Sequence, residues 1–310
     1  MKIIRYEHQG VEQNGVLLPG GKDIFPFKHV APDFSEISIN ELIIKFKDFD
    51  QEKVNGIISR YEKNALNEVE KSEIIPISNI IEKPLIPSPV HDVLCVGKNY
   101  QDHVLELKNH LDDEPEIPQG QELAEKAIYF GKRTLRILGD GESVVSRLDI
   151  DSELDYEAEL AVIIGKEGSD IPREDAESYI FGYSIFNDVS SRVLQSTHSQ
   201  WFKGKSLDTY AAMGPVIVTK DELPFPIHLD VECRVNGEVR QKSNTKLFLT
   251  DIPTIIYELS LGMALEPGDI IATGTPAGVG IGMKPPRFLK KGDVVECEIQ
   301  GIGVLKNVID

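Results

Sequence analysis

The sequence predicts an α+β fold, in which a large domain with a mixed, mainly antiparallel β core follows a smaller N-terminal α/β domain. Three observations predict this fold. From Leu148 onward, short apolar runs alternate with turns that contain glycine or proline, a pattern typical of strands. Few segments in this part read as helices, so the regular strand–helix alternation of a doubly wound sheet is missing. A proline-rich stretch separates this part from the beginning of the chain.

The composition is that of an ordinary folded protein. The chain has 310 residues, of which 41% are hydrophobic and 27% charged, and this length exceeds that of a usual single domain. With 33 basic against 51 acidic side chains, the net charge is -18, which repels a phosphate backbone and argues against nucleic acid as a partner. A small anion would need a local positive site, supplied by a metal ion or by a few lysine and arginine side chains.

No membrane or export segment is expected. The first ten residues, MKIIRYEHQG, lack the apolar core of a secretory signal, and no run approaches the roughly 18 apolar residues that span a bilayer. We therefore expect a cytoplasmic protein. The cysteines Cys95, Cys233 and Cys297 lie far apart in apolar, strand-like contexts, which predicts buried thiols rather than disulfides or a zinc site.

Residues 1–83 are expected to form the small N-terminal domain. Asn14-Gly15 and Gly20-Gly21 lie between apolar runs and are typical of hairpin turns. Ser38 and Glu41 have the spacing of a capping box ahead of an apolar helix. Residues 84–92 carry three prolines, which disfavour helix and central strand and indicate a linker.

Residues 93–310 are expected to form the large domain. Its expected strands are residues 93–97, 160–165, 179–187, 216–219, 229–235, 270–274 and 294–299. Helices are expected over residues 101–110, 190–195 and 253–261. The stretch 111–126 is dense in acidic residues and contains two prolines, so a mobile, solvated excursion is expected there.

Three carboxylates stand at the start of an apolar strand, in LDYEAELAVIIG from Leu154 to Gly165. In strand geometry Asp155, Glu157 and Glu159 point to one face, about 7 Å apart. Like charges entering a core strand are costly unless a cation or protons neutralise them. The pattern favours a metal site over the alternative, a solvated edge strand.

Asp188 stands at the end of a second apolar strand. Together with Glu157 and Glu159 it would form an all-oxygen site, which favours Mg²⁺, Mn²⁺ or Ca²⁺ over Zn²⁺. The alternative is that Asp188 caps the following helix. Arg192 and Gln195 lie three residues apart in that helix and could offer a planar cation and an amide to a carboxylate. A lone arginine there is otherwise a surface ion-pair partner.

Two further features could carry chemistry. His103 and Glu106 are three residues apart in an expected helix and make a usable general base, the alternative being a surface pair. Lys205 lies in the glycine-punctuated segment WFKGKSLDTYAAMGP and faces either a cleft, as an oxyanion partner, or solvent. The loop of residues 273–280, TGTPAGVG, can line an anion with backbone N–H groups, although it lacks P-loop spacing. Serine-hydrolase, zinc-protease and dinucleotide-binding motifs are absent.

In this order, these segments resemble the fumarylacetoacetate hydrolase family. The matching pieces are VGKNYQDHVLE (Val96 to Glu106), DYEAELAVIIGK (Asp155 to Lys166), GYSIFNDVSSRVLQ (Gly182 to Gln195), KGKSLDTYAAMGP (Lys203 to Pro215), VNGEVRQKSNTKLF (Val235 to Phe248) and LEPGDIIATGTPAGVG (Leu265 to Gly280). Together they cover nearly everything after the proline-rich linker.

The resemblance implies a catalytic domain built as a mixed β-roll, usually as a homodimer. It implies a divalent metal, Mg²⁺ or Mn²⁺ with Ca²⁺ as a further choice, held by Glu157, Glu159 and Asp188. The other site residues it implies are the water-activating lid pair His103 and Glu106, the charge-stabilising Lys205, and the substrate contacts Arg192, Gln195, Thr273 and Thr275.

The expected reaction is hydrolysis of a C–C bond in a small 2,4-dioxo carboxylate through a metal-stabilised enolate. His103 would take a proton from water, which attacks the distal carbonyl, and Lys205 would stabilise the oxyanion. Decarboxylation of a 2-oxo acid and isomerisation of the 2-hydroxyhepta-2,4-diene-1,7-dioate type are alternatives on the same residues. A catalytically silent metal-binding protein is the remaining alternative. The stretch from Leu107 to Gln121 is longer and more acidic than the family's usual link to an F-x-K-like piece, here Phe130-Gly131-Lys132.

Overall fold

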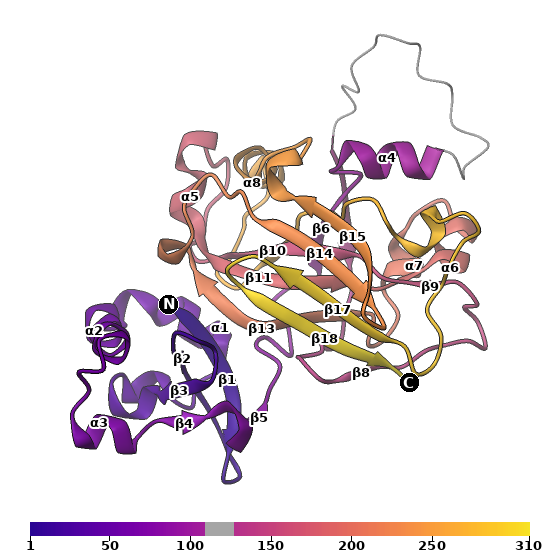
Figure 1. The fold of residues 1–310 in the computed structure, drawn as a ribbon. Coiled ribbons are helices and arrows are strands. Elements are labelled where there is room, and N and C mark those ends of the chain that lie inside the picture. Colours follow the sequence, from indigo (N-terminus) through magenta and orange to yellow (C-terminus); the bar gives the residue numbers. More distant parts are fainter. Residues whose placement is uncertain (109–126) are drawn as a thin grey trace.

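The structure is a computed structural model that describes residues 1–108 and 127–310 (Figure 1). The expected acidic excursion over residues 111–126 lies outside the described residues, as do the last two residues of the expected helix 101–110.

A long sheet contains strands from both the N-terminal part and the larger part of the chain. Its 11 strands follow the order β4-β3-β2-β1-β13-β11-β10-β16-β6-β7, with β5 paired to β1. The strands are β1 (Lys2–His8), β2 (Val11–Leu17), β3 (Asp23–Pro26), β4 (Ile75–Pro76), β5 (Ile81–Glu82), β6 (Val93–Gly97), β7 (Ile128–Lys132), β10 (Ala158–Ile164), β11 (Ile180–Asp188), β13 (Ala211–Thr219) and β16 (Ile270–Ala272). The pairing of β16 with β6 is parallel, and the other pairings in this sheet are antiparallel.

A second sheet packs on the first. Its five strands follow the order β15-β14-β17-β18-β8 and comprise β8 (Ser143–Val144), β14 (Asp230–Val235), β15 (Glu238–Asn244), β17 (Val294–Ile299) and β18 (Gly303–Ile309). Along β14 the buried residues Val231, Cys233 and Val235 alternate with more exposed polar ones, as expected where one face meets a core. A two-stranded ladder joins β9 (Leu154–Asp155) to β12 (Ser190–Ser191).

Helices lie at the edges and ends of the sheets. The α-helices are α1 (Ile39–Lys45), α2 (Gln51–Glu62), α3 (Glu68–Ser72), α4 (Gln101–Lys108), α5 (Ala176–Tyr179), α6 (Arg192–Thr197), α7 (Phe202–Lys205) and α8 (Ile252–Ser260). Single turns of 3₁₀-helix lie at Phe27–His29, Pro32–Phe34, Phe46–Asp48, Ile77–Asn79, Arg173–Asp175, Lys220–Glu222, Thr245–Leu247 and Gly280–Gly282. No helix among the described residues is long and apolar enough to cross a membrane.

The α+β class and the main strands of the larger part are confirmed, and one turn prediction is wrong. Asn14-Gly15 lies inside β2, where a Cβ on Gly15 would stand 2.8 Å from the carbonyl oxygen of Phe25. Glycine is therefore required there by close approach of β3 rather than by a turn. The turn between β1 and β2 is made by Gln9 and Gly10, both with positive φ. The capping box of Ser38 and Glu41 is confirmed, and so are the buried free thiols.

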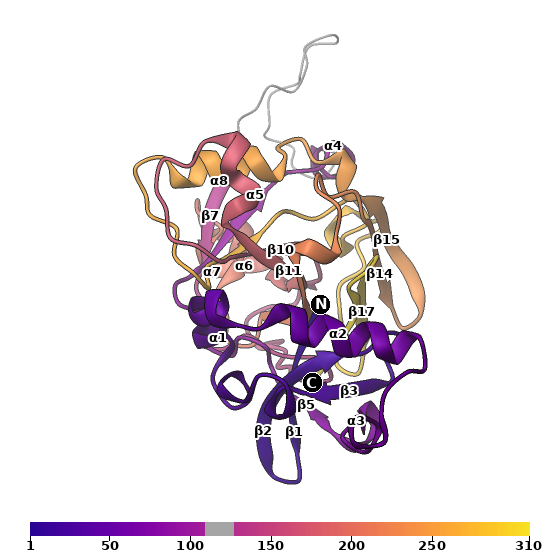
Figure 2. The same ribbon diagram turned by 90° about the vertical axis from the view of Figure 1, so that its left-hand side faces the viewer.

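The N-terminal elements share a sheet and a core with the rest of the chain. Ile3 on β1 pairs with Ile217 on β13, and Phe46 packs edge-on against Phe181 with ring centroids 4.8 Å apart. Figure 2 shows these elements gathered below β10, β11 and β14. The division into residues 1–83, 84–92 and 93–310 stays a prediction.

Candidate metal centre

The ends of β10 and β11 bring three carboxylates together. Glu159 lies in β10 opposite Phe186, Glu157 precedes that strand, and Asp188 ends β11. One oxygen from each of Glu157, Glu159 and Asp188 lies within 4.8 Å of the others, and all three residues are buried. The Asp188 N–H donates to the Glu157 carbonyl at 2.9 Å, which fixes the two segments against each other.

Asp155 does not join this cluster, so the prediction that it shares a face with Glu157 and Glu159 is wrong. The chain leaves strand geometry between β9 and β10, at Tyr156 and Glu157. Asp155 instead accepts hydrogen bonds from Arg192 Nε at 2.9 Å and from the N–H groups of Gly280 and Ile281 at 2.7 and 3.1 Å.

Asp188 is not a helix cap. Helix α6 is capped by Ser191, whose hydroxyl accepts from the Leu194 N–H at 3.3 Å. The alternative reading of Asp188 is therefore wrong, and its carboxylate is available to the cluster.

Two buried lysines flank the carboxylates. Lys205 Nζ lies 2.7 Å from Glu157 Oε2 and 2.7 Å from Asp188 Oδ2, while Lys132 Nζ lies 2.6 Å from Asp188 Oδ1. Burial alone would raise the pKa of Glu157, but the cations of Lys205 and Arg192 outweigh it and lower this pKa to about 2. Glu157 is therefore a carboxylate at neutral pH.

Glu159 lacks such compensation. No lysine or arginine among the described residues forms an ion pair with it, and its hydrogen bond comes from the Gly274 N–H at 2.7 Å. Burial, together with the nearby carboxylates Asp188 and Glu157, raises the pKa of Glu159 well above its ordinary value. A further cation beside Glu159 would favour its charged form.

The cluster fits a divalent cation. Asp188 Oδ1 is buried and has no hydrogen-bond donor among the described residues, although it forms an ion pair with Lys132 Nζ at 2.6 Å; the Lys132 ammonium donates to the carbonyl oxygens of Val189 and Lys205. A cation would satisfy this oxygen and remove the charge imbalance at Glu159. Three carboxylates are the donor set that hard divalent cations prefer.

The His103–Glu106 pair lies on α4 next to the cluster. His103 Nδ1 is 3.4 Å from Glu106 Oε2, and the Glu106 carboxylate accepts from the Gly278 N–H at 3.0 and 3.1 Å. His103 is only 5% exposed, which speaks against the surface-pair alternative. His103 and Glu157 line the same cavity, so the imidazole lies close to the candidate metal ligands.

A small cavity of about 30 Å³ lies between these groups. The predicted site residues that line it are His103, Glu157, Glu159, Arg192, Gln195, Lys205 and Thr275. Thr273 is not among the lining residues, and its hydroxyl donates to the Leu160 carbonyl at 2.8 Å inside the sheet. The structure therefore brings most of the predicted substrate contacts to one cavity, without Thr273.

Arg192 connects the carboxylates to this cavity. Its Nη1 lies 2.8 Å from Glu157 Oε1 and donates to Gln195 Oε1 at 2.9 Å, whereas its buried Nη2 has no hydrogen-bond partner among the described residues. Asp155 and Glu157 raise the pKa of Arg192 against the opposing effect of burial. Arg192 therefore carries a buried N–H group without a partner among the described residues, in a side chain that lines the cavity.

Sequence reasoning missed several residues of the site. Lys98, with a positive φ of 57°, Phe130 and Trp201 also line the cavity, and Trp201 packs edge-on against Phe130 with centroids 5.3 Å apart. The single tryptophan of the chain was a usable signal. Lys132 was named only as the last residue of the F-x-K-like piece and was given no role, because fully buried lysines are rare.

The comparisons with known proteins identify the family. The sequence profile described as Fumarylacetoacetate (FAA) hydrolase C-terminal matches residues 92–310. The chain belongs to the fumarylacetoacetate hydrolase family. The family resemblance and the fold expected from it are therefore confirmed.

Individual members of the fumarylacetoacetate hydrolase family differ in reaction. Oxaloacetate tautomerase YisK of Bacillus subtilis (strain 168) is 48% identical over 224 residues, which are 72% of this chain and 71% of that protein. Fumarylacetoacetate hydrolase from psychrophilic Exiguobacterium antarcticum is 38% identical with a TM-score of 0.79 and covers 100% of this chain and 99% of its own. Maleylpyruvate hydrolase from Sphingobium sp. SYK-6, solved with manganese(II) and pyruvate, is 26% identical with a TM-score of 0.71 over 100% of this chain and 98% of its own.

Proposed function

We propose that this protein is a divalent-metal-dependent tautomerase that interconverts the keto and enol forms of a small 2-oxo carboxylate such as oxaloacetate. The observation that carries the proposal is the His103–Glu106 pair, with its buried imidazole, beside a cavity of about 30 Å³ that Arg192 also lines. Tautomerisation moves a proton within one small molecule. It needs no second reactant in the cavity.

The tautomerase named above supports this choice, because it shares 48% identity over most of the present chain. The metal supports it as well: when bound, a divalent cation would draw electron density from the 2-oxo oxygen and make the neighbouring C–H more acidic. Glu157, Glu159 and Asp188 are the residues that would hold this cation, with Mg²⁺ or Mn²⁺ as the expected ions.

The residues of the chain supply the proton transfer. Glu106, itself held by the Gly278 N–H, accepts from Nδ1 of His103 and leaves Nε2 as the base. His103 takes a proton from C3 of the keto acid and returns it to the 2-oxo oxygen, so that one C–H bond breaks and one O–H bond forms. Arg192 Nη2 binds the carboxylate, and Lys205 stabilises the negative charge that develops on oxygen.

Hydrolysis of a 2,4-dioxo acid is the second candidate. The full-length match to the Exiguobacterium fumarylacetoacetate hydrolase favours it. The same His103–Glu106 pair could deprotonate a water instead of a substrate carbon. The substrate would then carry a distal carbonyl, and the products would be two smaller acids.

The test is a mass-resolved turnover assay on oxaloacetate and on a 2,4-dioxo acid, with Mg²⁺, Mn²⁺ or EDTA. Metal-dependent relaxation of the enol absorbance at unchanged mass supports the tautomerase. Two product acids would establish the hydrolase instead, release of CO₂ a decarboxylase, and no metal-dependent reaction on either compound would sink both candidates.

His103→Asn is expected to lower the metal-dependent rate by about 10²–10⁴-fold, because it removes the general base. The matched control is His198→Asn, since His198 is exposed at the end of α6. Equal rates in the two variants would remove His103 from the mechanism.

A further inference from the structure

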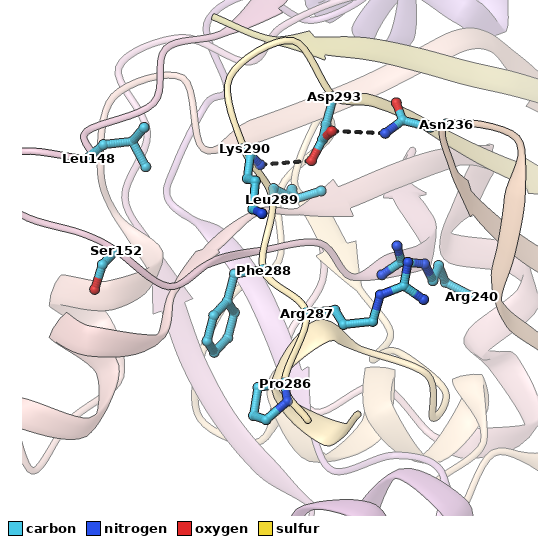
Figure 3. A pocket seen from close by; sticks show the side chains of 10 residues that line it. All are labelled: Leu148, Ser152, Asn236, Arg240, Pro286, Arg287, Phe288, Leu289, Lys290 and Asp293. Atoms are coloured by element: carbon cyan, nitrogen blue, oxygen red, sulfur yellow. Dashed lines mark hydrogen bonds between the residues drawn. The ribbon is translucent and has the colours of Figure 1, made fainter. Parts of the chain in front are cut away.

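A second, larger cavity lies apart from the candidate metal centre. It has a volume of about 510 Å³, and none of its lining residues lines the smaller cavity (Figure 3). A volume of this size suits a small organic ligand. It opens beside the segment from Pro286 to Lys290, which leads from the 3₁₀-helix Gly280–Gly282 to β17.

One wall of this cavity carries surplus positive charge. The guanidinium groups of Arg240 and Arg287 lie side by side (Figure 3) because both pair with Glu238, Arg287 at 2.6 and 2.7 Å and Arg240 at 3.2 Å. One carboxylate thus serves two guanidinium groups. The Arg240 side chain is 8% exposed, and its Nε has no hydrogen-bond partner among the described residues.

Lys290 adds a third cation on the same side. The nearby Asp293 is a counter-charge, but its carboxylate is engaged by the Lys290 backbone N–H at 2.8 Å and by Asn236 Nδ2 at 2.8 Å. The Lys290 side chain is exposed and forms no ion pair with Asp293. Three cations therefore face the cavity against two carboxylates, in a chain whose net charge is -18.

The lining also contains apolar side chains. Leu148, which is 49% exposed, Phe288 and the buried Leu289 line the cavity. An exposed leucine beside a phenylalanine gains from contact with an apolar ligand body. A lining with both cationic and apolar side chains matches a molecule that carries a carboxylate on a short apolar or aromatic body.

We propose that this cavity is an effector site for a small organic carboxylate. A chain of hydrogen bonds connects it to the candidate metal centre. The backbone N–H of Arg287 donates to the Gly280 carbonyl at 2.9 Å, and the backbone N–H of Gly280 donates to the Asp155 carboxylate at 2.7 Å. That carboxylate accepts in turn from Arg192 Nε at 2.9 Å. Binding of a ligand that moves Arg287 is thereby coupled to the position of Arg192, the arginine proposed to hold the substrate.

The test uses benzoate as the probe and the Mn²⁺-loaded full-length protein. Benzoate binding is measured by calorimetric titration in wild type, in Arg287→Gln/Lys290→Gln and in Leu148→Asp. The double variant removes two cations of the lining, and Leu148→Asp changes its apolar part; these are the two wall variants. All three positions are exposed, so folding is expected to persist. The matched control is Lys291→Gln, because Lys291 pairs with Asp310 instead of lining the cavity.

Both wall variants should weaken benzoate binding at least tenfold, and Lys291→Gln should leave it within twofold. Affinity within twofold of wild type in both wall variants, or no binding in wild type, overturns the site. Coupling is read from the fluorescence of Trp201, the single tryptophan, which lines the smaller cavity. Benzoate should change this fluorescence in wild type and in Lys291→Gln but not in the double variant; an unchanged signal in wild type overturns the coupling.

Discussion

At the scale of single residues, the chemistry of the site depends on how charges are shared among buried groups. Lys205 already forms ion pairs with Glu157 and Asp188, whereas Glu159 forms no ion pair among the described residues. Such an imbalance inside a core is costly unless a cation resolves it. The carboxylate cluster is therefore better explained by metal binding than by stability.

Lys132 is expected to position Asp188 for the metal. Its ammonium group donates to the carbonyl oxygens of Val189 and Lys205 and lies 2.6 Å from Asp188 Oδ1 as an ion pair. Lys132→Met should weaken Mn²⁺ binding about 10–100-fold, as loss of a partner that orients a metal ligand usually does. Binding can be followed by electron paramagnetic resonance of Mn²⁺.

The direction of this change separates two roles of Lys132. If the lysine acted only as a like charge near the metal, its removal would strengthen Mn²⁺ binding. Unchanged or tighter binding in a folded Lys132→Met variant would therefore contradict the positioning role. Lys132→Arg, which keeps the charge, is the conservative comparison.

At the scale of elements, α4 and the loop after β16 together hold the proposed base. Gly282 lies so close to α4 that a Cβ there would stand 2.0–2.3 Å from the Glu106 side chain. Gly282→Ala should displace the Glu106 carboxylate from His103 and lower the metal-dependent rate about tenfold, because an unoriented imidazole is a poorer base. The melting temperature should change little, since a flexible side chain can move away.

Gly131→Ala in β7 is the matched control, because a Cβ there meets no atom closer than 3.9 Å. Steady-state rates and thermal melting of both variants check the prediction. A full rate in Gly282→Ala would show that the Glu106 contact is dispensable.

The edge strand β5 should make stability depend on pH through Glu82. Burial, and then the charge of Asp140, raises the pKa of Glu82 to about 7 in the folded protein, from 4.5. A raised pKa means that the folded state holds the proton more tightly. The stabilising contribution of the protonated Glu82 carboxyl is complete below about pH 4.5 and is lost as the pH rises through about 7.

Glu82→Gln should therefore raise the free energy of unfolding at pH 8 by about 1–2 kcal/mol, after a discount for partial exposure, and change it little at pH 4. Denaturant titrations at both values measure this. Glu36→Gln, at an exposed position, is the control. A wild-type stability that does not fall between pH 5 and 8 relative to Glu82→Gln would contradict the assignment.

At the scale of the whole molecule, local patterns predicted the strands better than their arrangement. β6 and β17 occupy the residues expected from their apolar runs. The pairing of β1 with β13 could not be foreseen, because it joins residues about 215 positions apart and no local pattern encodes it. The continuous sheet is a product of tertiary contacts.

The candidate site was predictable in its ligand types and less so in its geometry. Glu157, Glu159 and Asp188 stood at strand ends, where side chains from neighbouring strands meet. Asp155 could not be separated from them by spacing alone, because the backbone leaves the strand at Tyr156. Thr273 was expected as a substrate contact from the family resemblance, but its hydroxyl donates to the Leu160 carbonyl within the sheet.

We infer that the buried carboxylates form a divalent metal site. Its most direct test is calorimetric titration of Mn²⁺ into the metal-stripped wild-type protein, Glu159→Gln and the control Glu167→Gln, whose residue is exposed. The account predicts one Mn²⁺ per chain in wild type and control, and at least tenfold weaker binding in Glu159→Gln. Equal affinity in all three proteins, or no binding to wild type, would contradict it.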